Sequence, residues 1–238
     1  MTDEKTLREQ VCEIGRRLYA RCFVAGNAGN LSCRMAADRV LCTPTLISKG
    51  FMQPDDLCVI DLEGKRLSGE RRPTSELALH LEVYRTEPGA RGVVHCHPPH
   101  ALAFAIARED IPTGVLPEIE VFLGEVPRAD YETPGGDAFA AMIRPYIGRA
   151  NTVVLSNHGT VSWGPTLERA CWNTEAVDAY CHALILAKLV GNVERLPEAK
   201  VAELLDLRPR MGEGPDPRRT AGGSLLVNPE FGKRPPAD

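Results

Sequence analysis

Three histidines in this sequence are spaced so that they could bind one metal ion. His95 and His97 lie within GVVHCH, residues 92–97, an apolar run typical of a strand. Because successive side chains of a strand point to opposite faces, both imidazoles project from one face and Cys96 from the other. Two ligands do not complete a tetrahedral site. His158, which follows the apolar run TVVLSN, is the candidate for the third ligand, because functional sites gather at the ends of strands in α/β folds.

The histidine pair also has a second interpretation. Two histidines one residue apart are equally consistent with side chains that are solvated or hydrogen-bonded, so the pair alone does not identify a metal site. The remaining histidines, His80, His100 and His182, are predicted to be structural or to lie at the surface.

Glu76 is the acidic residue that could act beside such a metal. It ends the segment PTSE, residues 73–76, at the expected start of a helix. A carboxylate in the first turn complements the helix dipole, so capping is one interpretation and proton transfer is the other. The same helix start presents backbone N–H groups beside the hydroxyls of Thr74 and Ser75, an arrangement that binds anions such as phosphate. The segment GNAGN, residues 26–30, is either a second cradle or an ordinary turn.

The elements that must position these residues alternate along the chain. Helical periodicity and capping signals predict helices over residues 4–22, 74–86 (with Thr74 or Ser75 as N-cap), 100–107 and 166–190. Short β-like runs predict strands over residues 31–35, 39–43, 57–62, 92–97, 152–157 and 160–164, with a hairpin turn over 61–67. Because strands and helices are mixed throughout, an α/β layered domain is favoured.

The composition is that of a globular protein with one core. The chain has 238 residues, of which 43% are hydrophobic and 25% are charged. The net charge of −4 and the absence of a basic run give no indication of nucleic-acid binding. The charged N-terminus has no apolar signal region, and no stretch approaches the roughly 18 apolar residues that span a membrane. We therefore expect a cytoplasmic protein with no membrane partner, whose eight cysteines are reduced and mostly buried.

The chain is expected to divide into one domain, residues 1–211, and a C-terminal tail, residues 212–238. The tail is rich in proline, glycine and arginine, which predicts a flexible segment. Deletion of residues 214–238 is accordingly expected to leave the fold intact.

Five short segments carry a resemblance to known proteins. They are AGNLS (28–32), TPT (43–45), RPTSE (72–76), VVHCHPPHA (93–101) and LSNHG (155–159). Together they resemble the class II aldolase/adducin family, whose members include L-fuculose-1-phosphate aldolase and L-ribulose-5-phosphate 4-epimerase. The resemblance implies a single α/β layered domain with a mostly antiparallel central sheet flanked by helices. It also implies a homotetramer with active sites between subunits.

The resemblance assigns roles to individual residues as well. It implies that His95, His97 and His158 hold a divalent metal, with zinc (Zn2+) first and manganese (Mn2+) or another divalent ion as alternatives. Glu76 becomes the catalytic acid/base, which also touches the metal in the resting state. The residues implied to bind the substrate phosphate are Gly29, Asn30, Thr45, Thr74 and Ser75.

The implied activity is that of a metal-dependent aldolase, a lyase that cleaves a sugar phosphate by retro-aldol chemistry through a metal-stabilised enediolate. Alternatives within the family are a sugar-phosphate epimerase, a dehydratase and a sugar-acid phosphate decarboxylase. An epimerase usually has aspartate where Glu76 stands. A non-catalytic, adducin-like interaction module is the alternative from another class, and it would have no need of Glu76 and the three histidines.

The sequence departs from the family pattern at the phosphate loop and at its tyrosines. Leu46 stands where a glycine is common, and its Cβ would hinder close approach of the backbone to a phosphate. Lys49 could compensate, although a solvated surface position is the favoured interpretation. The segment 116–125 contains no tyrosine and none follows Tyr180, so the general acid of fuculose-phosphate aldolase has no evident counterpart.

Overall fold

An eight-stranded sheet forms the centre of the computed structural model, which describes residues 3–214 and 216–218. Its strand order is β4-β3-β2-β1-β5-β8-β7-β6, and every neighbouring pair is antiparallel except β6 and β7, which are parallel. The strands are β1 (Asn30–Ala36), β2 (Arg39–Cys42), β3 (Cys58–Ile60), β4 (Arg66–Ser68), β5 (Gly92–Cys96), β6 (Arg128–Ala129), β7 (Thr152–Leu155) and β8 (Gly159–Gly164).

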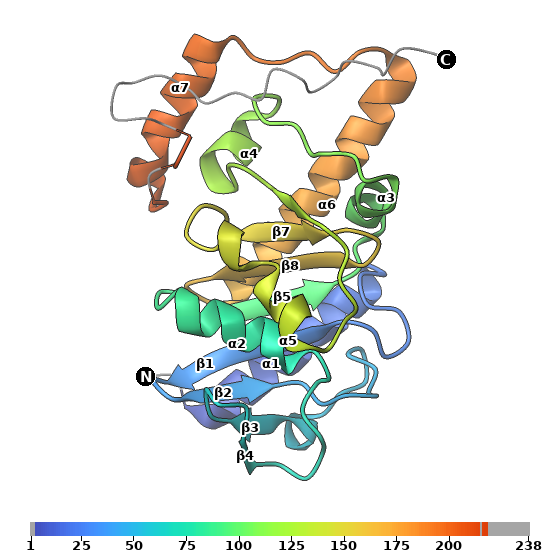
Figure 1. Cartoon of the computed structure of the whole chain (residues 1–238), viewed down its shortest axis with the longest axis vertical. Helices are drawn as coiled ribbons and strands as arrows, with labels where there is room; N and C mark the ends of the chain where they lie inside the picture. Colours follow the sequence, from blue (N-terminus) through green and yellow to red (C-terminus); the bar gives the residue numbers. More distant parts are fainter. Residues whose placement is uncertain (1–2, 215, 219–238) are drawn as a thin grey trace.

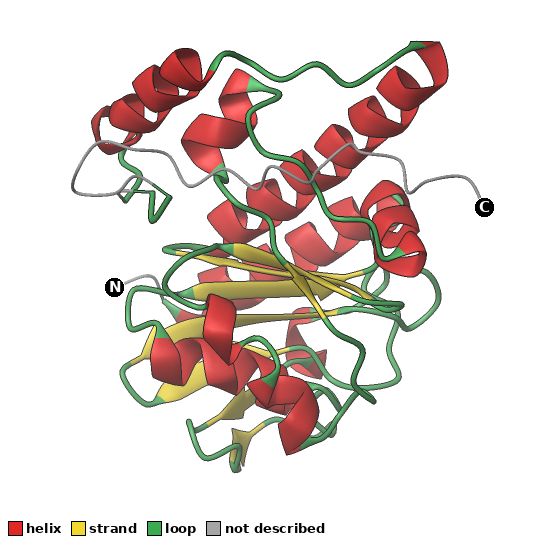
Figure 2. Ribbon diagram, turned by 45° about the horizontal axis from the view of Figure 1, so that its top comes forward, coloured by secondary structure: helices red, strands yellow, loops and turns green. Residues whose placement is uncertain are grey.

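Helices cover both faces of this sheet (Figure 1, Figure 2). They are α1 (Glu4–Ala20), α2 (Leu77–Thr86), α3 (Pro99–Ala107), α4 (Pro117–Phe122), α5 (Asp137–Ala141), α6 (Leu167–Val190) and α7 (Glu198–Leu207). Helix α1 and the first part of α6 pack on one face, and α2 and α5 pack on the other. The predicted α/β domain, with a mostly antiparallel sheet flanked by helices, is confirmed.

Neighbouring residues of one strand belong to different cores. Val93 of β5 packs with α2 and α5, whereas Val94 packs with α1. Both faces of the sheet are therefore buried, which is why β5 and β7 contain adjacent apolar residues and not a simple alternation of apolar and polar ones. A third cluster joins α3, α4 and α6 beside β7.

Helix α2 begins later than the sequence predicts. Its first residue is Leu77 and its N-cap residue is Glu76, whose side chain makes no capping hydrogen bond, so the predicted cap at Thr74 or Ser75 is wrong. The backbone N–H of Thr74 donates instead to the carbonyl oxygen of Thr43 at 3.1 Å. This bond ties the chain before the helix to the loop after β2, and the helix begins only after the chain has left that contact.

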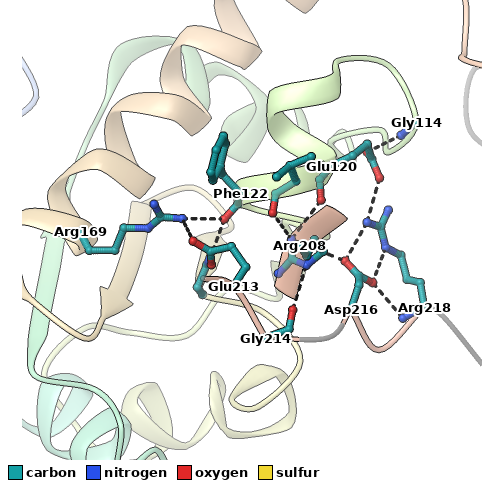
Figure 3. Close-up of polar contacts among 11 residues, drawn as sticks. Gly114, Glu120, Phe122, Arg169, Arg208, Glu213, Gly214, Asp216 and Arg218 are labelled. Carbon is teal, nitrogen blue, oxygen red and sulfur yellow. Dashed lines mark hydrogen bonds and ion pairs between the residues drawn. The ribbon is translucent and has the colours of Figure 1, made fainter. Parts of the chain in front are cut away.

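The C-terminal segment is attached to α4 by a cluster of charged side chains (Figure 3). Arg208, which follows α7, donates to the carbonyl oxygens of Glu120 and Val121 at 3.0 and 2.8 Å. Arg218 pairs with the fully buried carboxylate of Glu120 at 2.8 Å, and with Asp216 at 2.8 Å. A buried carboxylate is costly without a charged partner, so these pairs fix the segment on the helix.

The flexible tail expected from residue 212 onward stays a prediction. Asp216 and Arg218 are both buried, and composition alone does not reveal the carboxylate that holds them. Residues 215 and 219–238 lie outside the part of the chain that the structure describes.

Two further expectations concern cysteines and membrane spans. All eight cysteines lie within the described ranges, where none is bonded to another; seven are buried and Cys22 is exposed, as predicted. None of the helices in the described residues combines the length and the apolar character needed to cross a membrane.

Candidate active site

Strands at the centre of the sheet carry the candidate metal ligands. β5 lies between β1 and β8, and His95 is in register with Asn30 on one side and Val161 on the other. His97 follows the last residue of β5, and His158 lies in the turn that joins β7 to β8. Because β8 is hydrogen-bonded to β5, this turn brings His158 back to the other two histidines.

The three imidazoles form one cluster. The ring centroid of His95 lies 5.2 Å from that of His97 and 4.7 Å from that of His158, and the remaining pair is 5.1 Å apart. One nitrogen from each ring lies within 4.8 Å of the others. A group of this size could hold one ion with nitrogen ligands at about 2.0–2.1 Å. The structure thus brings together the three histidines that the spacing singles out.

The hydrogen bonds around the cluster leave its inner nitrogens unsatisfied. Nδ1 of His95 donates its proton to the carbonyl oxygen of Thr160 at 2.9 Å, so Nε2 of the neutral ring carries a lone pair. Nε2 of His95 and Nε2 of His97 are both buried without a hydrogen-bond partner. Such nitrogens are rare in folded proteins, and a metal ion would satisfy both.

Burial keeps these imidazoles neutral. It lowers the pKa of His95 well below its ordinary value, and positive charge on His158 or His97 would lower that pKa further. Burial likewise lowers the pKa of His97 and of His158. Neutral imidazole is the form that binds a metal, so the cluster is ready to bind one at neutral pH.

The carboxylate of Glu76 faces the cluster. Its Oε1 lies 3.3 Å from Nε2 of His158, and its Oε2 lies 3.3 Å from Nε2 of His95. The side-chain N–H of Asn30 donates to Oε2 at 2.7 Å. The carboxylate therefore contacts the histidines and makes no hydrogen bond to the N–H groups of α2, although Glu76 occupies the N-cap position of that helix.

A small cavity of about 190 Å³ lies beside the cluster. His97, His158 and Glu76 contribute to its lining. The residues that the resemblance assigns to phosphate binding line it as well, namely Gly29, Asn30, Thr45, Thr74 and Ser75. The candidates for metal binding and for phosphate binding therefore meet around one space.

Lys49 lines the same cavity. It is only 1% exposed, so the favoured interpretation of a solvated surface residue is wrong. Its ammonium group donates to the carbonyl oxygens of Asn27 and Ile47, both at 2.7 Å, and burial lowers its pKa to about 8. Two of its three protons are engaged by these carbonyls, which leaves the third for an anion in the cavity.

Leu46 completes the loop on this side of the cavity. Its φ is 57°, in the left-handed region, and its side chain is 80% exposed. That conformation favours glycine and is costly for leucine. The loop thus keeps the backbone of a glycine turn although a leucine occupies it.

Two glycines allow the chain to approach the histidines closely. A Cβ on Gly159 would collide with the carbonyl oxygen of Cys96 and would lie 2.6 Å from Cδ2 of His97. Gly29 has a φ of 70°, and a Cβ there would lie 2.9 Å from the carbonyl oxygen of His95. Both positions therefore require glycine for this packing.

The sequence interpretation missed the polar residues behind Glu76. His80 is fully buried and bonded to Asn30, and contacts with Ser32 and Tyr84 follow. The spacing of these residues in the sequence could have revealed them. Positions 76, 80 and 84 share one face of a helix, and positions 30 and 32 share one face of a strand.

Two larger cavities lie outside this site. Their volumes are about 490 and 530 Å³, they adjoin the C-terminal segment, and neither is lined by a residue of the histidine cluster. We place the candidate site at the smaller cavity because titratable groups with shifted pKa values converge there, whereas size alone says nothing about chemistry.

Known proteins resemble this chain over most of its length. Residues 9–185 match the family described as the class II aldolase and adducin N-terminal domain. A 3-oxo-tetronate 4-phosphate decarboxylase of Cupriavidus necator is 32% identical over 213 residues, which cover 87% of this chain and 97% of that protein. An L-fuculose phosphate aldolase of Methanococcus vannielii is 34% identical over 169 residues, covering 71% and 88%. The crystal structure of YgbL from Klebsiella pneumoniae matches with a TM-score of 0.80 at 30% identity, covering 86% of this chain and 100% of the other.

Proposed function

Because the chain belongs to the class II aldolase and adducin family, we propose that it is a divalent-metal-dependent lyase that cleaves a carbon–carbon bond of a phosphorylated sugar or sugar acid. One observation carries this proposal. Three imidazoles kept neutral by burial and one carboxylate converge beside a cavity that hydroxyls and an ammonium group also line. An interaction module would have no need of this arrangement.

We assign His95, His97 and His158 as the ligands of one divalent ion, with zinc as the first candidate and manganese as an alternative. The donor set fits such an ion, because buried imidazole nitrogens without a hydrogen-bond partner face the cluster. When bound, the metal would supply the positive charge that stabilises an enediolate formed from the substrate carbonyl and its neighbouring hydroxyl.

Glu76 is the proposed proton shuttle. Its two carboxylate oxygens lie 3.3 Å from the histidines, so they are within reach of a substrate atom that approaches the cluster. In aldol cleavage the carboxylate would accept the hydroxyl proton as the carbon–carbon bond breaks. It would then return a proton to the carbon that received the electron pair.

The far end of the substrate is proposed to carry a phosphate. The groups that would bind it are the backbone at Gly29, the hydroxyls of Thr45, Thr74 and Ser75, and the ammonium of Lys49. The N-terminus of α2 adds the partial positive charge of the helix dipole. Lys49 takes the place of the close backbone contact that Leu46 hinders.

Two cleavage reactions could use these residues. Retro-aldol cleavage of a sugar phosphate releases an aldehyde and needs a base, and it is our first proposal because Glu76 stands where that base is needed. Decarboxylation of a 3-oxo sugar-acid phosphate releases carbon dioxide and needs no base to begin. It is the second candidate, favoured by the likeness to the Cupriavidus necator decarboxylase over 97% of that protein.

Turnover by metal-loaded protein tests the proposal. Protein with measured zinc or manganese content is offered ketose 1-phosphates, ketose 5-phosphates and 3-oxo sugar-acid phosphates. Release of an aldehyde identifies an aldolase, and release of carbon dioxide identifies a decarboxylase. If fully loaded protein cleaves none of them, the lyase proposal is rejected.

Elemental analysis tests the ligand assignment. We expect about one metal per chain in the unsubstituted protein and a loss of metal in His95→Ala and His158→Ala. His182→Ala is the matched control, because His182 is an exposed histidine outside the cluster. Full metal content in all three variants would refute the assignment.

A further inference from the structure

A chain of buried polar side chains runs from Glu76 into the core. Nδ2 of Asn30 bonds to Oε2 of Glu76 at 2.7 Å, and Oδ1 of Asn30 bonds to Nε2 of His80 at 2.5 Å. Nδ1 of His80 bonds to the hydroxyl of Ser32 at 2.6 Å, and that hydroxyl bonds to the hydroxyl of Tyr84 at 2.9 Å. Asn30, the most exposed of the four residues behind the carboxylate, is only 4% exposed.

Only one assignment of donors and acceptors satisfies all of these hydrogen bonds. A carboxylate accepts hydrogen bonds and donates none, so Asn30 must present its N–H to Glu76 and its carbonyl oxygen to His80. That carbonyl also only accepts, so Nε2 of His80 carries the proton and Nδ1 accepts from Ser32. The hydroxyl of Ser32 then accepts from Tyr84. Every donor therefore points towards Glu76.

This arrangement requires a neutral His80, because a cationic ring would have no nitrogen to accept from Ser32. Burial lowers the pKa of His80 to about 3, so the ring is neutral at pH 7. The other tautomer would set a lone pair of His80 against the Asn30 carbonyl. The amide would then have to turn its oxygen towards the carboxylate of Glu76, at the place of the present 2.7 Å hydrogen bond.

We propose that His80, acting through Asn30, is a positioning residue that holds the carboxylate of Glu76 in place for proton transfer. The inference rests on the proposed function, in which Glu76 is the proton shuttle. It changes the role expected of Asn30, since the amide oxygen and one amide proton are engaged within the protein and not by a phosphate. It also gives His80 a role beyond packing.

The direction of these hydrogen bonds can be determined in the metal-free protein from the tautomer of His80. Long-range proton–nitrogen NMR spectra distinguish the two neutral tautomers and the cation of a histidine, and the signals of His80 are assigned by their loss in His80→Gln. We expect the tautomer with its proton on Nε2 at pH 7. A proton on Nδ1, or a cationic ring, overturns the proposal.

A matched pair of substitutions at position 80 tests the effect on catalysis. His80→Gln places an amide N–H near the position of Nε2, whereas His80→Asn places its amide near Nδ1 and leaves the carbonyl of Asn30 without a donor. The assay uses the substrate found in the turnover test above and proteins of equal metal occupancy. We expect kcat of His80→Asn to fall roughly 10–100-fold with KM little changed. We expect kcat of His80→Gln to stay near that of the unsubstituted protein. Both substitutions remove the ring, so a role in packing alone predicts equal kcat values, and that result overturns the proposal.

Two further variants keep the test decisive. Ser32→Ala replaces His80→Asn if the latter does not fold; it removes the donor to Nδ1, and we expect a mixed tautomer together with a lower kcat. An unchanged tautomer and kcat in Ser32→Ala overturn the proposal. Full turnover of Glu76→Gln rejects Glu76 as the proton shuttle and this inference with it. Reduced turnover of Glu76→Gln combined with equal kcat values for the two variants at position 80 rejects this inference alone.

Discussion

Glu76 is the residue at which catalysis and structure can be separated by one substitution. Glu76→Gln keeps the shape of the side chain but removes the base. We expect turnover to fall by roughly 10²–10⁴-fold, the usual loss when a general acid–base is removed. The fold and the metal should be retained, because the three histidines still form the cluster. The measurement is kcat at determined metal occupancy, with the melting temperature as control, and unchanged kcat would leave the mechanism without its base.

Leu46 offers a test of backbone strain. A left-handed conformation costs a leucine about 1–2 kcal/mol, and the side chain is 80% exposed, so it contributes little packing. Leu46→Gly removes the strain but adds about 0.5–1 kcal/mol of unfolded-chain entropy. We expect a net stabilisation of about 0.5–1 kcal/mol in urea unfolding. Leu46→Ala keeps the Cβ and is the control; a Leu46→Gly variant that is about 0.5–1 kcal/mol less stable than Leu46→Ala would show that the strain is absent.

At the scale of single residues, the types and spacing of the side chains predict which of them could act together, but they do not predict the contacts between distant residues. The alternation of strand side chains suffices to pair His95 with His97. The orientation of Glu76 depends on a hydrogen bond from Asn30, which lies far away in the sequence. The burial of Lys49 likewise depends on the carbonyl oxygen of Asn27. No local propensity contains this information, so the sequence does not predict the contacts of Glu76, and the expectation of a solvated Lys49 is wrong.

Among the elements, those with strong periodicity were predictable and those fixed by distant contacts were not. The central strands and the long helices α1 and α6 follow from apolar pattern and length. The start of α2 does not, because the backbone of Thr74 bonds to Thr43 before the helix begins. The contacts of the C-terminal segment do not follow from its composition either, because composition gives no sign of the ion pair between Arg218 and the buried carboxylate of Glu120 on α4.

The attachment of this segment to α4 can be measured by a charge deletion. Arg218→Met leaves the buried carboxylate of Glu120 unpaired, which should lower the free energy of unfolding by about 3–5 kcal/mol. Deletion of residues 214–238 should have a similar effect, contrary to the expectation from composition. Adding Glu120→Gln to Arg218→Met removes the unpaired charge and should recover much of the loss. Arg210→Met, at an exposed arginine of the same segment, is the control, and equal urea midpoints for Arg210→Met and Arg218→Met would contradict the prediction.

The whole molecule should lose stability in acid. His80 and His95 are buried, and burial lowers the pKa of each below the ordinary value of 6.5. Such a group binds protons more readily in the unfolded chain, so stability is complete above pH 6.5 and declines as the pH falls towards the folded-state pKa. We expect the Tm of metal-free protein to follow this course in melts at a series of pH values. His80→Gln lacks one of these groups, so its Tm should decline less steeply as the pH falls. A parallel decline of Tm in the two proteins would contradict a lowered pKa for His80.

Assembly is a second property of the whole molecule, and here the proposal rests on the family. Large apolar side chains remain exposed on the single chain, including Leu189 at 78% and Val190 at 89%, and a neighbouring subunit could cover them. We expect a homotetramer, with part of each active site supplied by a neighbour. Light scattering over a range of concentrations measures the mass, and a stable, active monomer would exclude this proposal.

Gly159 lies so close to β5 that a Cβ there would collide with the carbonyl oxygen of Cys96 and press on the ring of His97. A substitution at this position would therefore displace one ligand even if all three histidines were retained. A related sequence with another residue in place of this glycine is therefore expected to have lost the metal site, and the sequence alone suffices to detect this change. When relatives are sorted into catalytic and non-catalytic members, a sequence that keeps the histidines but has lost the glycine belongs with the second group.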